Sequence, residues 1–384
     1  MKILDSLFPG VTSDIFLQSY WTQQVCTTVP GAGSRQPLIS IEEIDAVIAG
    51  AQLNPDDIKL AKDGSIIPGS RYTEKGVINV CRLLDYYRNG ATIILKRLDL
   101  HMYKLAEFCR RLEQELHGVR EVYINAYLTP PAAQGFPAHY DDHDVFILQE
   151  HGEKDWKIYS CMADFPTADI PYNLAPSYID TPPTEVRLGA GMALYMPRGF
   201  VHEARTGDSH SIHLTVTIVP VTYSEILTEM ATLLAGNISV ARQTLPADYF
   251  SSTSTPAMPD AMLTALSGSL LKEALVQKDI TGFKKPLVGG LFNHIFHDRQ
   301  ITAGSILATR PYLRYQLKTS EDTLMLDFYG KTIRLPAVVK EDLYFVLKSS
   351  TFRVNDMNGM LDEESCLILV SSLVEEGFLE VVQY

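Results

Sequence analysis

The segment from Glu121 to Val219 constrains the fold most, because its hydrophobic pattern has the two-residue period of β-strands. In the first strand, Tyr123, Asn125 and Tyr127 share one face and aliphatic residues share the other. Short strands separated by Gly and Pro turns predict a sandwich or barrel. Polar side chains on one face of several strands favour a barrel with a polar mouth, wrapped by helices. A sheet with one solvated face is the alternative.

Within this segment, His139 and Asp141 form an H-x-D pair, and His202 follows about sixty residues later. Residues i and i+2 of a strand point to the same side, so a strand would direct His139 and Asp141 to one metal ion. A second strand could then supply His202. Two imidazoles and one carboxylate are the facial triad that binds Fe(II) with open coordination positions. The H-x-D spacing alone is equally compatible with a surface or capping histidine.

Composition narrows the class of protein. The chain has 384 residues, 46% of them hydrophobic, which is enough for two or three domains. Its formal net charge of −13 disfavours direct binding of nucleic acid and suits a basic partner, although a generally acidic surface explains the charge as well. No apolar run approaches the ~20 residues of a membrane span, and the first residues do not resemble a signal peptide.

The five cysteines are scattered and never form C-x-x-C pairs. This pattern disfavours a zinc ribbon and predicts reduced thiols in an intracellular, cytoplasmic location.

The periodicity outside the barrel is mainly helical. Apolar residues recur every three to four positions between Leu98 and Leu116, between Ser224 and Leu234, and between Ala261 and Val276. Beyond residue 300, strands are expected at 312–315 and 324–328, and helices at 341–347 and 363–373. Acids outnumber bases in this last region, so DNA binding is not expected there.

Several short motifs occur in a fixed order: NAYLTPP from Asn125, HYDD from His139, VFILQ from Val145, GEKDW from Gly152, PRG from Pro197 with His202, and HSIHLT from His210. Together they resemble the JmjC-type cupin oxygenases, and more narrowly the ribosomal oxygenases, which hydroxylate arginyl or histidyl residues of ribosomal proteins.

The resemblance implies an α+β chain with a double-stranded β-helix (cupin/JmjC) barrel and flanking helices. The catalytic domain would cover residues 1–222, with a helical part to residue 120 and the barrel from 121 to 222. A helical dimerisation region would follow at 223–300, and a winged-helix-like C-terminal domain at 301–384.

The resemblance also implies the cofactors Fe(II), 2-oxoglutarate and O2. The iron ligands would be His139, Asp141 and His202. The residues that bind 2-oxoglutarate would be Lys154, Asn125, Tyr127 and Thr217, with Lys154 paired to its distal carboxylate.

The residues themselves support the assignment of Lys154 only in part. Lys154 shares a strand face with Trp156 and Ile158, which would turn it inward, and a buried ammonium needs an anion. A lysine beside a hairpin turn is more commonly solvated.

Other histidines have structural interpretations. His143 could support a metal ligand, but a role as a mere neighbour is preferred. His213 fits a core histidine, and His294 and His297 at helical spacing fit structural roles because no third ligand accompanies them.

These observations predict an Fe(II)- and 2-oxoglutarate-dependent dioxygenase that hydroxylates a histidine or arginine side chain of a protein such as a basic ribosomal protein. The expected partners are a polypeptide substrate and a second copy of the chain in a homodimer, without nucleic acid or membrane. The alternatives are the same chemistry on a small peptide or metabolite, and a non-catalytic cupin scaffold.

Overall fold

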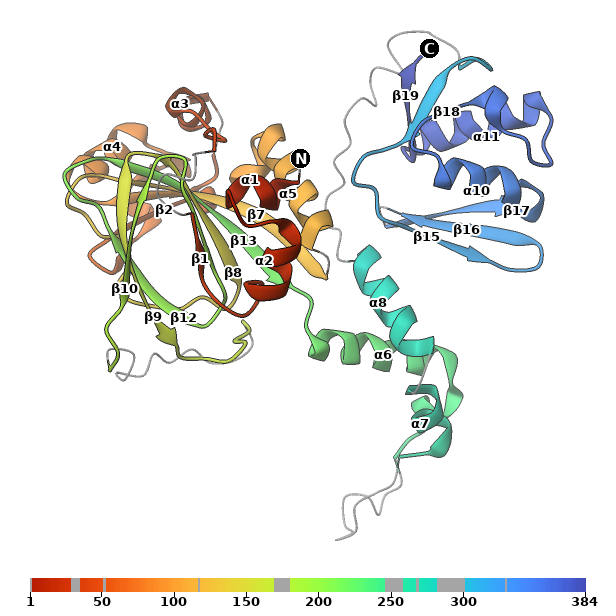
Figure 1. Ribbon diagram of the computed structural model, residues 1–384, viewed down its shortest axis with the longest axis horizontal. Helices are drawn as coiled ribbons and strands as arrows, with labels where there is room; N and C mark the ends of the chain where they lie inside the picture. The colour runs from red at the N-terminus through yellow and green to blue at the C-terminus, as the bar shows by residue number, and fades with distance from the viewer. Residues whose placement is uncertain are drawn as a thin grey trace. The chain divides into compact units, whose positions relative to one another are not determined.

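The computed structural model divides into two compact units, Met1–Pro220 and Val221–Tyr384, shown in Figure 1. The structure describes residues 2–28, 35–50, 53–116, 118–168, 180–245, 258–266, 269–281, 301–328 and 330–384. His294 and His297 lie outside these residues. Among the helices described, none is both long and apolar enough to cross a membrane.

The first unit contains a large and a small antiparallel sheet. The large sheet has the strand order β1-β11-β8-β13-β7-β6-β2-β3, and the small sheet has the order β10-β9-β12. The strands of the large sheet are β1 (Cys26–Thr27), β2 (Ile58–Lys62), β3 (Ser65–Ile67), β6 (Thr92–Leu95), β7 (Val119–Thr129), β8 (Asp144–His151), β11 (Ala193–Met196) and β13 (Ser211–Pro220). Those of the small sheet are β9 (Glu153–Cys161), β10 (Thr184–Gly189) and β12 (Phe200–Arg205). A short hairpin, β4 (Thr73–Glu74) with β5 (Val77–Ile78), lies apart from both sheets.

Helices cover the outer face of the large sheet. They are α1 (Ile3–Leu7), α2 (Ser13–Ser19), α3 (Ile41–Gly50), α4 (Val80–Arg88) and α5 (Tyr103–Leu116). The buried face of α5 packs on β7 in one continuous core (Figure 1). The periodicity predicted a helix from Leu98, but α5 begins at Tyr103 after a 3-10 turn at Leu98–Leu100. Arg97 has a φ of 53°, which is outside the α-helical range.

The alternation of side chains gives the large sheet two different faces. On β7, Val122, Ile124 and Ala126 are buried in the core shared with the helices. The residues between them face the other way, toward a cavity inside the barrel. On β13 the same division separates Leu214, Val216 and Ile218 from His213, Thr215 and Thr217. A second apolar cluster, drawn from β8, β9, β10 and β11, closes the space between the two sheets.

The second unit begins with helices α6 (Tyr223–Asn237), α7 (Asp260–Leu266) and α8 (Ser269–Thr281). The single helix predicted between Ala261 and Val276 is therefore two helices. Its remaining elements are β14 (Ile306–Thr309), β15 (Tyr315–Thr319), β16 (Thr323–Phe328), β17 (Lys331–Pro336), α10 (Lys340–Lys348), β18 (Phe352–Arg353), α11 (Glu363–Glu375) and β19 (Leu379–Gln383). The strand predicted at 312–315 begins only at Tyr315, because Tyr312 has a φ of 62°, outside the range of a strand.

Gly152 forms the tight turn between β8 and β9 with a φ of 65°, and a Cβ there would lie 1.8 Å from the carbonyl oxygen of His210. We expect Gly152→Ala to destabilise the first unit by at least about 2 kcal/mol, because both the left-handed backbone and the clash oppose a side chain. Denaturant unfolding followed by tryptophan fluorescence measures this change, since Trp21 and Trp156 both belong to the first unit.

Gly207→Ala is the matched control, because a Cβ at Gly207 would meet no atom within 4 Å and its φ is not left-handed. Equal unfolding midpoints for the two variants would contradict this account of the hairpin.

Candidate metal centre

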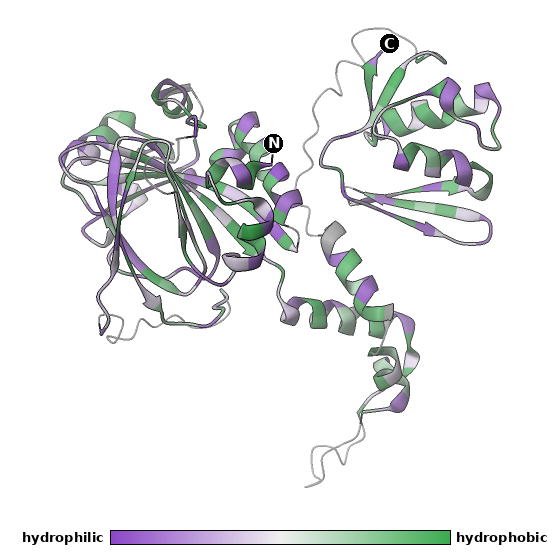
Figure 2. Ribbon diagram, viewed as in Figure 1, coloured by the Kyte–Doolittle hydropathy of each residue, from purple (hydrophilic) through white to green (hydrophobic). Residues whose placement is uncertain are grey.

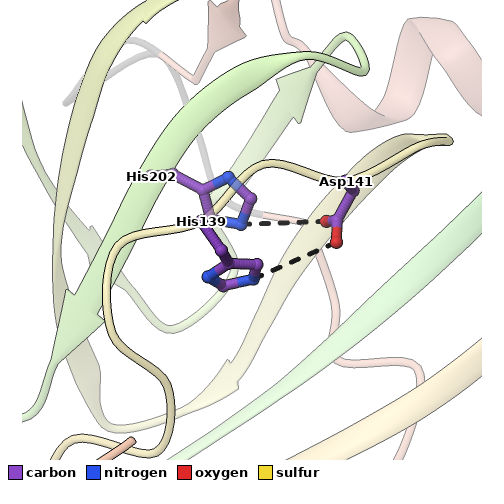
Figure 3. A group of neighbouring side chains, drawn as sticks. All are labelled: His139, Asp141 and His202. Atoms are coloured by element: carbon purple, nitrogen blue, oxygen red, sulfur yellow. Dashed lines mark ion pairs between the residues drawn. The ribbon is translucent and has the colours of Figure 1, made fainter. Parts of the chain in front are cut away.

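The three candidate metal ligands converge at one point, as Figure 3 shows. His139 and Asp141 lie in the loop between β7 and β8, and His202 lies on β12. Asp141 Oδ1 is 4.0 Å from His139 Nε2, and Asp141 Oδ2 is 3.8 Å from His202 Nε2. One ligand atom from each residue lies within 4.8 Å of the others. The group can therefore hold one metal ion.

The convergence does not arise from a strand, as the H-x-D spacing suggested. His139 forms an isolated bridge with His202, with N–H···O distances of 3.0 and 2.7 Å, and Asp141 lies in irregular backbone. The carbonyl of Asp141 accepts a hydrogen bond from Gly199 N at 3.0 Å. Backbone pairing across the loop, rather than the period of a strand, brings the ligands together.

Backbone carbonyls fix the tautomer of both imidazoles. His139 Nδ1 lies 2.8 Å from the carbonyl oxygen of Pro137, and His202 Nδ1 lies 3.1 Å from that of Phe200. A carbonyl only accepts, so each Nδ1 carries the proton and each Nε2 keeps a free lone pair. Burial lowers the pKa of His202 to about 4, which keeps this imidazole neutral and able to bind a cation at neutral pH.

A cavity of about 290 Å³ contains the triad and every other predicted site residue: Asn125, Tyr127, Lys154 and Thr217. This volume is at the lower end of the range for small-molecule sites. The register of the large sheet explains the grouping, because Asn125 pairs with Thr215 and Tyr127 with His213 on neighbouring strands.

Lys154 is buried, with 5% of its surface exposed, and its Nζ donates to Thr129 Oγ1 at 3.0 Å. Within the part of the chain that the structure describes, no carboxylate lies within 4 Å of this ammonium. Burial lowers the pKa of Lys154 to about 7. A buried cation whose protein partner is a hydroxyl fits an anionic ligand in the same cavity.

The polar residues of β7 are also held in place. Asn125 Oδ1 accepts a hydrogen bond from Arg97 N at 3.0 Å, which leaves its amide nitrogen as the group available to a ligand. Tyr127 stacks on His213 with ring centroids 4.8 Å apart. Burial raises the pKa of Tyr127, so its hydroxyl remains a hydrogen-bond donor.

His213 and His143 both line the cavity in addition to the three candidate ligands. His213 is buried, as predicted for a core histidine, but it lines the cavity, and burial lowers its pKa well below the usual range. His143 also lines the cavity, with its Nδ1 2.6 Å from Asp142 Oδ1. Burial opposes protonation of His143, but the hydrogen bond and the nearby carboxylates together raise its pKa.

Sequence reasoning assigned no site role to several other residues of the cavity wall: Thr92, Phe136, Trp156 and Thr215, together with Thr129, which contacts Lys154. Thr129 lies on the same face of β7 as Tyr123, and Thr215 on the same face of β13 as Thr217. The alternation of side chains along these strands could therefore have predicted that both threonines face the cavity. Thr92 lies in a short apolar strand and gave no such signal.

Comparison with known proteins identifies the fold family. A family model for the JmjC domain matches residues 101–226. This match covers about one third of the chain. Together with its helices and large antiparallel sheet, this confirms the predicted JmjC cupin fold, whereas the winged-helix and dimerisation assignments stay predictions.

Two curated relatives are similar to part of this chain. The "bifunctional lysine-specific demethylase and histidyl-hydroxylase NO66" of Drosophila pseudoobscura pseudoobscura is 32% identical over 230 residues, covering 56% of this chain and 23% of the relative. "Ribosomal oxygenase 1" of Gallus gallus is 36% identical over 140 residues, covering 35% of this chain and 22% of the relative. The match thus spans about a quarter of the length of these relatives.

Among solved structures, the chain resembles YcfD, a ribosomal oxygenase from Escherichia coli. Its complex with cobalt and 2-oxoglutarate has a TM-score of 0.55 at 16% identity and covers 98% of this chain and 99% of that one. At this identity the likeness concerns the fold alone.

The triad predicts a single site for a divalent metal in the JmjC domain. We expect about one equivalent of Co²⁺ per chain in equilibrium dialysis with metal analysis. Asp141→Ala and His202→Ala should each weaken binding by more than the roughly 10- to 100-fold lost with an outer hydrogen-bond partner of a ligand, because each removes a ligand itself.

His101→Ala is the matched control, because His101 is exposed and lies outside the cavity. Unchanged affinity in Asp141→Ala and His202→Ala would contradict the assignment of the ligands.

Proposed function

We propose that this chain is an Fe(II)- and 2-oxoglutarate-dependent dioxygenase that hydroxylates a side chain of a polypeptide. One observation carries the proposal: a His–Asp–His group shares a cavity with Lys154, a buried ammonium that has no carboxylate partner among the described residues. A metal and a dicarboxylate are together the ligands that this combination suits.

The residues have separate tasks in this proposal. His139, Asp141 and His202 would hold the metal on one side and leave the cavity side open. Lys154 would bind the distal carboxylate of 2-oxoglutarate, while Asn125, Tyr127 and Thr217 would line its pocket. When bound, Fe(II) supplies the oxidising chemistry in which 2-oxoglutarate and O2 give succinate and CO2 and one oxygen atom enters a C–H bond of the substrate.

The proposed substrate is a basic polypeptide, such as a ribosomal protein, modified on a histidine or an arginine. The names of the relatives, a histidyl-hydroxylase and ribosomal oxygenases, support a protein substrate. The formal net charge of −13 suits a basic partner.

We also propose that residues 223–300 form a dimer interface. Figure 2 shows hydrophobic stretches along α6 and α8, and the exposed apolar residues there include Tyr223, Leu227, Leu271 and Leu275. Two exposed helices with such residues favour a partner surface.

For residues 301–384 we propose a winged-helix-like domain. Helices α10 and α11 share one core with three-stranded sheets, which supports the proposal.

An intracellular, reducing location is supported by five cysteines that are all free.

Turnover with candidate substrates tests the central proposal. With Fe(II), 2-oxoglutarate and O2, we expect succinate release to rise with ribosomal proteins, and one of those proteins to gain the mass of one oxygen atom. Asp141→Ala should abolish both signals, because the metal is lost.

The alternatives predict different results in the same assay. Succinate release with small metabolites but not with proteins would replace the polypeptide by a small substrate. No succinate with any substrate, and none formed without substrate, would leave a non-catalytic scaffold.

Proton linkage tests the role of Lys154. Because its pKa is lowered to about 7, the free lysine is mostly neutral at pH 8. A bound carboxylate favours the ammonium, so binding of 2-oxoglutarate to metal-loaded protein should take up close to one proton at pH 8. It should take up little at pH 6, where Lys154 is already charged. Titration calorimetry in buffers of different ionisation enthalpy measures this uptake.

Lys154→Met removes the charge and keeps the length of the side chain. We expect it to weaken 2-oxoglutarate roughly 10- to 100-fold through loss of a charge-assisted hydrogen bond, and to abolish the proton uptake at pH 8. Lys157→Met, on the same strand but facing outward, is the control. Wild-type affinity in Lys154→Met would exclude the proposed carboxylate contact.

A further inference from the structure

Glu203 directly follows the candidate ligand His202 on β12 but points away from the metal. His202 and Ala204 line the cavity, and neighbouring residues of a strand face opposite sides. The Glu203 carboxylate therefore lies on the outer face of the small sheet, where it is half-buried. It can act on the site only through the residues that it touches.

Each oxygen of this carboxylate accepts a hydrogen bond from a different part of the fold. Tyr159 on β9 donates its hydroxyl to Oε1 at 2.7 Å. Gln134, in the loop between β7 and β8, donates its amide to Oε2 at 3.0 Å. Glu203 thus joins the strand that bears His202, the neighbouring strand and the loop that bears His139 and Asp141.

The contact with Gln134 continues to a metal ligand. The same Gln134 nitrogen donates to the carbonyl of Phe136 at 3.0 Å. The next carbonyl, that of Pro137, orients the His139 ring through Nδ1 at 2.8 Å. Displacement of Gln134 would therefore loosen the segment that sets the direction of the His139 lone pair.

We propose that Glu203 is a positioning residue that keeps the loop bearing His139 and Asp141 in register with His202, and thereby sets the metal affinity of the site. This inference rests on the proposed metal function. The proposal also explains why position 203 is a glutamate. Each of its two carboxylate oxygens accepts one hydrogen bond, whereas the side-chain amide of a glutamine has only one acceptor oxygen.

The test is Mn²⁺ affinity, measured from the electron paramagnetic resonance signal of free Mn²⁺, together with the melting temperature of each variant. We expect Glu203→Ala and Gln134→Ala each to weaken Mn²⁺ binding by about 10- to 100-fold, the range for outer partners of metal ligands. Glu203→Gln should lose less, because one of the two hydrogen bonds can persist.

Non-additivity separates positioning from general destabilisation. The double variant Glu203→Ala/Gln134→Ala should have about the same Mn²⁺ affinity as whichever single variant binds Mn²⁺ less tightly, because both changes break the same connection. Glu185→Ala is the matched control: Glu185 is an exposed glutamate on β10 of the same sheet, 4.0 Å from Lys157. It should leave the affinity unchanged.

The outcomes separate the two proposals. Wild-type protein that binds no Mn²⁺ would overturn the metal function and this inference with it. Wild-type binding with unchanged affinity in folded Glu203→Ala would overturn the inference alone. If Glu203→Ala does not fold, Gln134→Ala decides in the same way, because it removes the connection to the loop and leaves the Glu203–Tyr159 hydrogen bond intact.

Discussion

The two backbone hydrogen bonds between His139 and His202 are the interaction on which the candidate metal site depends. Residues that exchange both hydrogen bonds across an antiparallel pair have side chains on the same face. The imidazoles accordingly lie with ring centroids 4.4 Å apart, although the two residues are 63 positions apart in the sequence. The bridge therefore both closes the loop after β7 and aligns two candidate ligands. Asp141 follows two residues after His139, with its carboxylate oxygens 4.0 and 3.8 Å from the two Nε2 atoms.

The candidate site also requires a sheet whose two faces differ in chemistry, one apolar and one polar. Residues such as Ile124 and Val216 hold the large sheet to its helices, and their neighbours Asn125 and Thr215 form part of a polar cavity on the opposite face. Strand periodicity alone achieves this division. The cavity is lined with polar groups without interrupting the apolar core, because each set of side chains belongs to its own side of β7 and β13.

Alternation made much of this arrangement predictable. The barrel strands and the polar face of β7 follow from residue periodicity. For Lys154 periodicity indicated the inward face, whereas its position beside a hairpin turn favoured a solvated side chain. The conformation around the candidate ligands did not, because the H-x-D pair lies in a loop whose course depends on contacts distant in the sequence, such as His139 with His202 and Gln134 with Glu203. Spacing suggested three residues that do converge in the structure, but for the wrong local reason. The helix predicted over 261–276 failed similarly, since periodicity does not detect a break between two helices of similar pattern.

Lys154 shows how the cavity relates to stability. Burying an ammonium against one hydroxyl opposes folding, and the same burial lowers the pKa of Lys154. The surrounding structure tolerates it because Trp156 and Ile158 of the same strand pack into the apolar cluster between the sheets. A fold optimised for stability alone would place an aliphatic residue at this position. A ligand carboxylate would convert an unfavourable buried charge into an ion pair, so the same residue that weakens the empty barrel would strengthen the occupied one.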